Sequence, residues 1–303
     1  MSQRKKKQHY VWQHYLKGWT QKSKIWCRFE GRTFPVATFN VAHENDFYRL
    51  KELEAPDLAL VNELINRMEP GLQEGARGWV RIFHEPFALR RAARLRGITT
   101  AAFEAAVDVE INNIEENIHA QIETEAVSLL DELRKGTLDF LADDERAVHF
   151  MRFISAQYMR TPGVQHRTVT EVGALLGANP ERYWGLLRTI LATNLGFVLY
   201  TLRNSVAFTF LDAPAEAEFI TGDQPTINVV ASDEIQVPPE KLVLYYPLAP
   251  RLAVLVRPDR KLGARTMERL ALTTEEVLAY NRRIVGASYR QIYATSLVAL
   301  SSL

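Results

Sequence analysis

The sequence predicts an α+β fold, in which C-terminal strands and an N-terminal hairpin form an antiparallel sheet and a large helical block is inserted between them. Two observations support this prediction. Helical periodicity covers nearly all of the middle of the chain, whereas the residues from Val206 onward form short apolar runs that Pro, Gly and Asp interrupt. We therefore expect a mixed α+β sheet domain made of residues 1–50 together with 204–303, and a helical block made of residues 51–203.

The first 50 residues predict one short helix and one hairpin. Apolar residues at helical spacing, with a glycine near the end, predict a helix within Gln8–Trp19. The runs Lys24–Phe29 and Thr33–Phe39 flank a loop that contains Gly31, which is typical of two paired strands. The polar segment His43–Asp46 is expected to be a loop, since adjacent side chains do not point at one metal ion without special geometry.

Helices are predicted throughout the inserted block. An amphipathic pattern begins near Pro56, where apolar residues share one face. Further helical patterns cover Trp79–Leu95, Thr100–Leu133, Asp144–Arg160 and Arg182–Leu202. The acidic run Asp143–Glu145 favours a helix N-terminus, because carboxylates there interact well with the helix dipole.

The C-terminal third predicts strands by its short, β-branched runs. These runs are Val206–Leu211, Glu218–Thr221, Thr226–Val230, Leu242–Pro247 and Leu252–Val256. A helix is expected over Glu275–Val285 and a last strand over Tyr289–Ala294. This order of elements completes the α+β prediction.

Composition limits the class of protein. The chain has 303 residues, of which 47% are hydrophobic and 24% charged, as in ordinary soluble proteins. Cys27 is its only cysteine, which excludes an internal disulfide and any multi-cysteine metal site. No apolar run approaches the roughly 20 residues of a membrane helix, and the basic start lacks the apolar stretch of a signal peptide. We expect a cytoplasmic protein with no membrane partner.

Charge is segregated along the chain although 37 Lys+Arg nearly balance 36 Asp+Glu. No acidic residue precedes Glu30, whereas Glu104–Glu145 is strongly acidic, so the two regions are expected to attract each other. The basic, aromatic-rich start is also typical of a nucleic-acid surface, on which cations hold phosphates and rings stack on bases. The alternative is a solvated basic tail followed by core aromatics.

Standard catalytic motifs are missing from the sequence. It contains no phosphate loop, no dinucleotide-binding glycine motif and no serine nucleophile elbow. Glu116 and His119 form one Glu-x-x-His half of a di-iron site, but no second half exists. We interpret this pair as part of a solvated helix face.

Two segments in the first two thirds of the chain carry residues of catalytic type. The N-terminal one contains Gln8, His9, Tyr10, Gln13 and His14. Imidazole titrates near neutral pH, so these side chains can support acid–base chemistry on a phosphate-bearing substrate; the alternative is a polar helix that caps the sheet, with His9 paired to a backbone carbonyl. In the helical block, Gln157 and Arg160 face the same way, and Arg160 is either an anion clamp or an ordinary helix-end cation.

Two further candidates lie near the C-terminus. Asp223 follows an apolar run and precedes Pro225 in a turn, where a carboxylate serves either as a catalytic base or metal ligand, or simply stabilises the turn. Asn281 interrupts an otherwise good helix, and a side-chain contact would offset its low helix propensity.

Several motifs resemble those of the family called domain of unknown function 4238. They are Lys7–Trp19 (KQHYVWQHYLKGW), Gln157 with Arg160–Pro162 (RTP), Phe219–Pro225 (FITGDQP), Tyr246–Pro250 (YPLAP) and Asn281. Trp12 stands where the family usually has proline, Gly222 and Gln224 vary its aspartate turn, and Ala249 replaces serine. Some members are associated with bacterial defence against phage, which implies a toxic effector or a phage-sensing protein here.

The leading hypothesis is a defence effector that acts on nucleic acid as a nuclease. His9, with Tyr10 beside it, would be a general acid or base, Asp223 would orient His9 or bind a metal, and Arg160 would clamp phosphate. Gln8, Gln13, His14, Gln157 and Asn281 would complete the binding site. The alternatives are a non-catalytic protein that binds nucleic acid or a phage component, and an enzyme that consumes a nucleotide or NAD. The sequence assigns no metal or cofactor.

Overall fold

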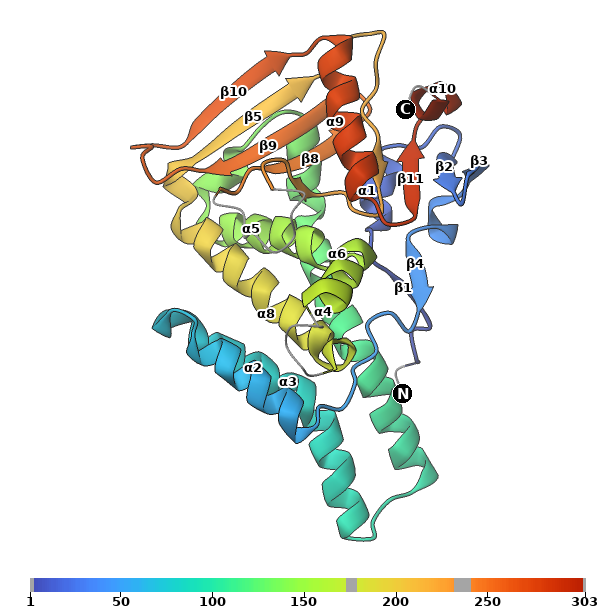
Figure 1. The fold of residues 1–303 in the computed structure, drawn as a ribbon, viewed down its shortest axis with the longest axis vertical. Helices are drawn as coiled ribbons and strands as arrows, with labels where there is room; N and C mark the ends of the chain where they lie inside the picture. The colour runs from blue at the N-terminus through green and yellow to red at the C-terminus, as the bar shows by residue number, and fades with distance from the viewer. Residues whose placement is uncertain (1–2, 173–178, 232–240, 302–303) are drawn as a thin grey trace.

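The computed structural model describes residues 3–172, 179–231 and 241–301. Figure 1 shows a sheet with one helix against it at one end of the molecule, long helices below it, and the chain's first strands along one side. The α+β class is therefore confirmed. In chain order, the helices of the block lie between the strands of the first 50 residues and those that follow residue 205.

The start of the chain differs from the expected helix. Strand β1 (Lys7–His9) pairs antiparallel with β4 (His43–Asn45), in the segment expected to be a loop, and only α1 (Gln13–Lys17) is helical. The pairing places His9 opposite His43. Helical spacing over three or four apolar residues does not reveal such a long-range pairing, and the pairing decides the local structure.

The predicted hairpin is confirmed as β2 (Ile25–Phe29) and β3 (Arg32–Val36). Glu30 and Gly31 have φ values of 49° and 75° in its loop, a backbone conformation that glycine tolerates best. The hairpin does not extend the main C-terminal sheet. It belongs to a separate four-stranded sheet of order β3-β2-β11-β6, with β6 (Thr221–Gly222) and β11 (Gln291–Ala294).

The larger sheet has the order β10-β5-β9-β8-β7. Its strands are β5 (Val206–Asp212), β7 (Ile227–Asn228), β8 (Leu244–Ala249), β9 (Leu252–Pro258) and β10 (Thr266–Ala271). Strand β10 was not predicted and pairs parallel with β5. Its residues are half-buried or exposed on both faces, so it lacks the buried apolar alternation that identifies a strand in sequence.

The longer helices follow the predicted patterns: α2 (Ala55–Asn66), α3 (Pro70–Leu95), α4 (Ala101–Arg134), α5 (Asp144–Met159), α8 (Pro180–Thr201) and α9 (Thr274–Ala287). The short helices α6 (Pro162–Arg167) and α10 (Leu297–Ser301) were not predicted. Asp143 caps α5 as expected, because its side chain accepts a hydrogen bond from the Arg146 backbone at 2.9 Å. Helix α3 begins nine residues earlier than predicted, at Pro70, where proline fits the first helical turn. None of the described helices is long and apolar enough to cross a bilayer.

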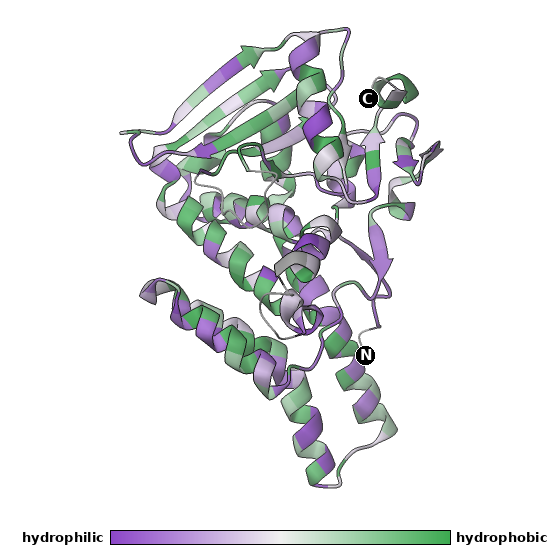
Figure 2. Ribbon diagram, viewed as in Figure 1, coloured by the Kyte–Doolittle hydropathy of each residue, from purple (hydrophilic) through white to green (hydrophobic). Residues whose placement is uncertain are grey.

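One core joins the sheets to helices α4 and α5. Trp12 packs on Phe153 with ring centroids 5.6 Å apart, and Tyr15 stacks on Tyr246 at 4.9 Å. A second buried cluster lies among α2, α3, α4 and α8. In Figure 2, β5 and β9 are largely green, whereas the surrounding helices alternate green and purple, as amphipathic helices do. The division of the chain into two domains stays a prediction.

Candidate functional site

The C-terminal candidates have backbone partners of their own, and Asp223 lies near Tyr10, where its charge adds to burial in raising the pKa of the Tyr10 phenol. Asp223, 1% exposed, accepts three backbone hydrogen bonds, from Tyr289 at 2.7 Å, Arg290 at 2.7 Å and Gln291 at 2.9 Å. Burial raises the pKa of its carboxyl, although these three N–H groups pull the pKa down. The turn after β6 is thereby fastened to the start of β11.

Asn281 has a similar role in the same region. Its Oδ1 accepts a hydrogen bond from the Ile220 backbone at 3.0 Å, and its Nδ2 donates to the Glu218 carbonyl at 2.8 Å. These bonds are the side-chain contact expected to offset its low helix propensity. Across the described parts of the chain, no hydrogen bond or ion pair joins Asp223 or Asn281 to His9 or Arg160.

Strand β1 presents its side chains alternately. Gln8 is fully buried, accepts from the Tyr48 backbone at 2.6 Å and donates to the Asn112 carbonyl at 2.9 Å. Tyr10 is also buried, with its ring 5.3 Å from that of Phe47, and burial raises the pKa of its phenol. Both residues therefore attach the start of the chain to the rest of the fold.

His9 lines an open cleft between the N-terminal segment and α4. The cleft has a volume of about 210 Å³, and we call it the polar cleft; its lining residues are His9, Trp12, Gln13, Glu116, His119, Ala120 and Glu123. Gln13 Nε2 lies 3.3 Å from Nε2 of His9, and the Phe39 backbone also hydrogen-bonds the imidazole. The backbone hydrogen bond that the structural alternative predicts for His9 is therefore present, but His9 also lines the polar cleft.

Helix α4 supplies the opposite wall. Glu116, His119 and Glu123 follow one another at helical spacing and so project from one side of the helix. The prediction of a solvated face for Glu116 and His119 is wrong, because His119 is 7% exposed and Glu116 is half-buried. The sequence shows the spacing of these residues, but the burial comes from α8 and the N-terminal segment, which no local pattern reveals.

Arg160 reaches the cleft wall through Glu123. Its guanidinium is 1% exposed and donates to Glu123 Oε1 at 2.5 Å and to Gln157 Oε1 at 3.3 Å. Among the described residues, Arg160 Nε and Gln157 Nε2 have no hydrogen-bond partner. The structure therefore brings together His9, Gln13, Gln157 and Arg160 of the predicted site residues.

Burial gives the ionisable groups of the polar cleft unusual proton affinities. It lowers the pKa of His9 to about 4, with His43 as the next contribution, and lowers that of His119 to about 4. It raises the pKa of Glu116 to about 7, although Arg160 pulls the other way. At neutral pH both imidazoles are uncharged, and about half of the Glu116 carboxyls are protonated.

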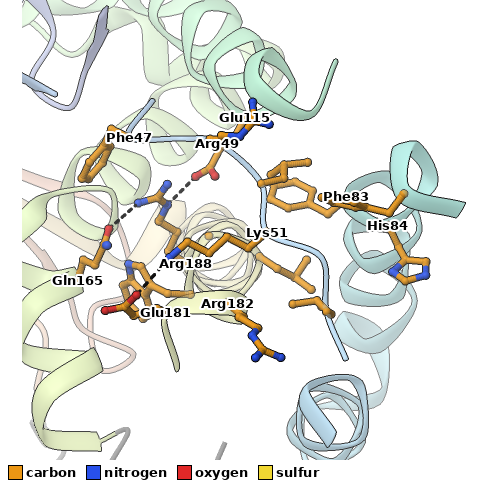
Figure 3. Close-up of a pocket in the computed structure, with 16 residues that line it drawn as sticks. Phe47, Arg49, Lys51, Phe83, His84, Glu115, Gln165, Glu181, Arg182 and Arg188 are labelled. Carbon is orange, nitrogen blue, oxygen red and sulfur yellow. Dashed lines mark hydrogen bonds and ion pairs between the residues drawn. The ribbon is translucent and has the colours of Figure 1, made fainter. Parts of the chain in front are cut away.

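A second buried ion pair lies behind this wall. Glu115 Oε1 accepts from Arg188 Nε at 2.5 Å and lies 3.5 Å from His119 Nε2. The Arg188 guanidinium also lies over the rings of Phe47 and Tyr48, at 4.9 and 4.8 Å from their centroids. Figure 3 shows Arg188 between Glu115 and Gln165, which accepts from it at 3.2 Å.

The basic start lies along the acidic helix, as predicted. Lys5 Nζ donates to Asn117 Oδ1 at 2.8 Å, and Arg4 pairs with Asp108 at 3.5 Å. Lys7 lies on the same side of β1 as His9. His14, in α1, faces a different part of α4, where its Nε2 lies 3.3 Å from Asp131 Oδ1. It does not line the polar cleft.

The described residues contain no group of three or more His, Cys, Asp or Glu side chains placed to hold a metal ion. What they define is an α+β protein with a cleft of buried acid–base groups, located where the first strand meets the helical block. The chain belongs to the family Protein of unknown function (DUF4238), whose model matches residues 7–180 and 192–297. Neither a curated protein nor a solved structure matches it.

Proposed function

We propose that this protein is a nuclease-like enzyme that cleaves RNA by acid–base chemistry in the polar cleft. The observation that carries the proposal is the meeting of His9 and Glu116, from segments over 100 residues apart, in the lining of one open cleft. A neutral imidazole can accept a proton, and a carboxyl whose pKa is about 7 can donate one at neutral pH. At a pH between these two pKa values, His9 is neutral and can accept a proton while Glu116 is protonated and can donate one.

The proposed reaction uses the ribose 2′-hydroxyl as nucleophile. His9 takes the proton of that hydroxyl while its oxygen forms a bond to phosphorus. The bond from phosphorus to the 5′-oxygen breaks, and Glu116 gives its proton to this leaving oxygen. The products are a 2′,3′-cyclic phosphate and a free 5′-hydroxyl, and proton exchange with water restores both side chains.

Neighbouring residues support the two catalytic groups. Gln13 contacts the His9 ring at 3.3 Å and so orients it. Arg160 is buried and paired with Glu123, so we assign it a positioning role instead of the predicted phosphate clamp. Lys7, on the His9 side of β1, is a cation available to a bound phosphate.

A defence role is part of the proposal only through the family resemblance, since some relatives are associated with resistance to phage.

The non-catalytic alternative also has a specific observation in its favour. Asp223 and Asn281 are saturated by backbone groups, as expected of residues that maintain the fold. On that alternative the basic N-terminal segment binds nucleic acid without cleaving it.

The test is a cleavage assay on a fluorescent oligoribonucleotide, run beside the matching oligodeoxyribonucleotide and NAD, with EDTA and with Mg²⁺. We expect cleavage of the RNA but not of the DNA or NAD. The RNA should be cleaved both in EDTA and in Mg²⁺. His9→Asn and Glu116→Gln should each lower kcat/KM by 100-fold or more, at about the size of one general acid or base. His14→Asn and the exposed Glu110→Gln are matched controls from the same segments and should retain activity.

Each other outcome selects an alternative. RNA binding without cleavage supports the non-catalytic protein, and loss of NAD supports the nucleotide-consuming enzyme. Cleavage that Mg²⁺ restores after EDTA, and that both cleft variants retain, would overturn the acid–base mechanism.

A further inference from the structure

A second cavity lies among the loop after β4, helix α3 and the first turns of α8. Figure 3 shows Lys51, Glu181 and Arg188 close together on one side of it, with Phe83 and His84 of α3 across from them. Its volume is about 60 Å³. One buried water needs about 15 Å³ of such space, so about four oxygen atoms fit.

The lining of this cavity presents cations. Arg49, Lys51, Arg182 and Arg188 carry positive charge, and Glu115 and Glu181 carry negative charge. Glu115 is engaged by Arg188, and Glu181 by Lys51 at 3.2 Å. The carboxylates that pair with Arg49 and Arg182 belong to Asp108, Glu54 and Asp57, which do not line the cavity. The lining therefore has two more positive than negative charges.

The same lining holds hydrogen-bond donors that lack acceptors. Trp184 is 2% exposed, and its indole Nε1 has no partner among the described residues. Arg49 Nη1 is buried and unpaired in the same way, and so is Nδ1 of His84. A buried donor without an acceptor costs free energy, and an oxyanion bound in this cavity would offer acceptors to donors of its lining.

We infer that this cavity is a binding site for the phosphoryl group of a phosphate monoester. Arg188 fixes one wall, because it is 3% exposed and held by Glu115 and Gln165. Phe83 and Phe87 form an apolar wall suited to the organic part of the ligand. The site does not include His9 or Glu116, and the inference stands independently of RNA cleavage.

The inference is tested by calorimetric titration of the purified protein with inorganic phosphate, adenosine 5′-monophosphate, adenosine and a 5′-phosphorylated deoxyribotrinucleotide, which has no 2′-hydroxyl and is not cleaved by the proposed reaction. We expect saturable binding of phosphate and the monophosphate and none of adenosine. If the trinucleotide binds as tightly as adenosine 5′-monophosphate, the ligand is the phosphorylated end of a strand. If it binds more weakly, the ligand is a free small molecule.

Variants locate the site. Lys51→Gln removes an exposed cation, and Trp184→Phe removes a single N–H and keeps a ring; each should weaken binding about tenfold, since each removes one charged interaction or hydrogen bond. Lys51→Arg should retain affinity, as should Arg81→Gln on the exposed face of α3 and His9→Asn in the polar cleft. Absence of saturable phosphate binding, or equal affinity in all variants, would overturn the assignment, whatever the outcome of the RNA assay.

Discussion

Replacing Asp223 with alanine separates a structural from a catalytic role for this residue. The substitution removes three charge-assisted hydrogen bonds to the backbone of residues 289–291 and leaves these N–H groups without their acceptor. If these bonds fasten the two strands, the variant loses stability. If Asp223 orients His9, the variant loses activity instead.

The expected loss of stability follows from the contacts. A hydrogen bond to a charged group contributes about 2 kcal/mol, so three contribute about 6 kcal/mol. Burial of the carboxylate itself costs free energy, as its raised pKa indicates, and we discount the sum by half to about 3 kcal/mol. For a chain of 303 residues the entropy of unfolding is about 0.6 kcal/mol/K, so that loss lowers Tm by about 5 °C.

Thermal unfolding followed by circular dichroism measures this change. The matched control is Asp212→Ala, which removes a surface ion pair with Arg269 and should cost less than about 1 kcal/mol. A shift below about 2 °C for Asp223→Ala, or the same shift in both variants, would refute the structural role. A specific loss of RNA cleavage by protein that is fully folded would restore the catalytic one.

Three further outcomes are expected. Arg160→Met leaves the half-buried Glu123 without its partner and should lower the free energy of unfolding by about 3 kcal/mol in thermal denaturation. A change below about 1 kcal/mol would count against a stabilising role for this pair. His9 and His119 have folded pKa values of about 4, below the unfolded value of about 6.5, so the unfolded chain takes up their protons first and the fold loses stability as pH falls from 6.5 to 4. Glu116 has its folded pKa raised to about 7, so the folded chain takes up its proton first, and this gain cancels the loss from one histidine. Unfolding free energy should therefore fall by up to about 1.4 kcal/mol per pH unit between pH 6.5 and 4.5, and His119→Gln should abolish this slope in urea titrations, whereas an unchanged slope would show that His119 titrates normally. Induced expression of the wild type in bacteria should arrest growth, and expression of folded His9→Asn should not. Equal arrest by both would show that toxicity does not depend on the polar cleft.

The fold class was accessible from the sequence because its signals are local. Helical periodicity located α4 and α5 within one residue at each end, and the acidic run at Asp143 marked a helix cap. The hairpin was equally clear, since its loop needs the positive φ that Gly31 provides.

Pairings between distant segments were not accessible. Strand β1 depends on residues 43–45 for its hydrogen bonds, and β10 depends on β5. Neither segment has a pattern strong enough to specify a strand alone, so tertiary context decides both.

The candidate site was predictable in part for the same reason. His9 and Gln13 stood out by residue type, and both line the polar cleft. Glu116 and His119 stood out by spacing, but their chemistry comes from burial, which depends on how α8 and the N-terminal segment cover α4. Asp223 had the composition of a catalytic turn, yet its carboxylate is occupied by backbone N–H groups that lie 66–68 residues further along the chain.

The pH dependence of RNA cleavage tests the roles of His9 and Glu116 most directly. Activity that needs a neutral His9 and a protonated Glu116 should give a kcat/KM profile with a plateau between apparent pKa values of about 4 and about 7, falling on both sides. His9→Asn should remove the acidic limb together with most of the rate, and Glu116→Gln the alkaline limb. No cleavage at any pH, or a rate that stays constant from pH 5 to about 9 although Glu116 titrates, would contradict acid–base catalysis in the polar cleft.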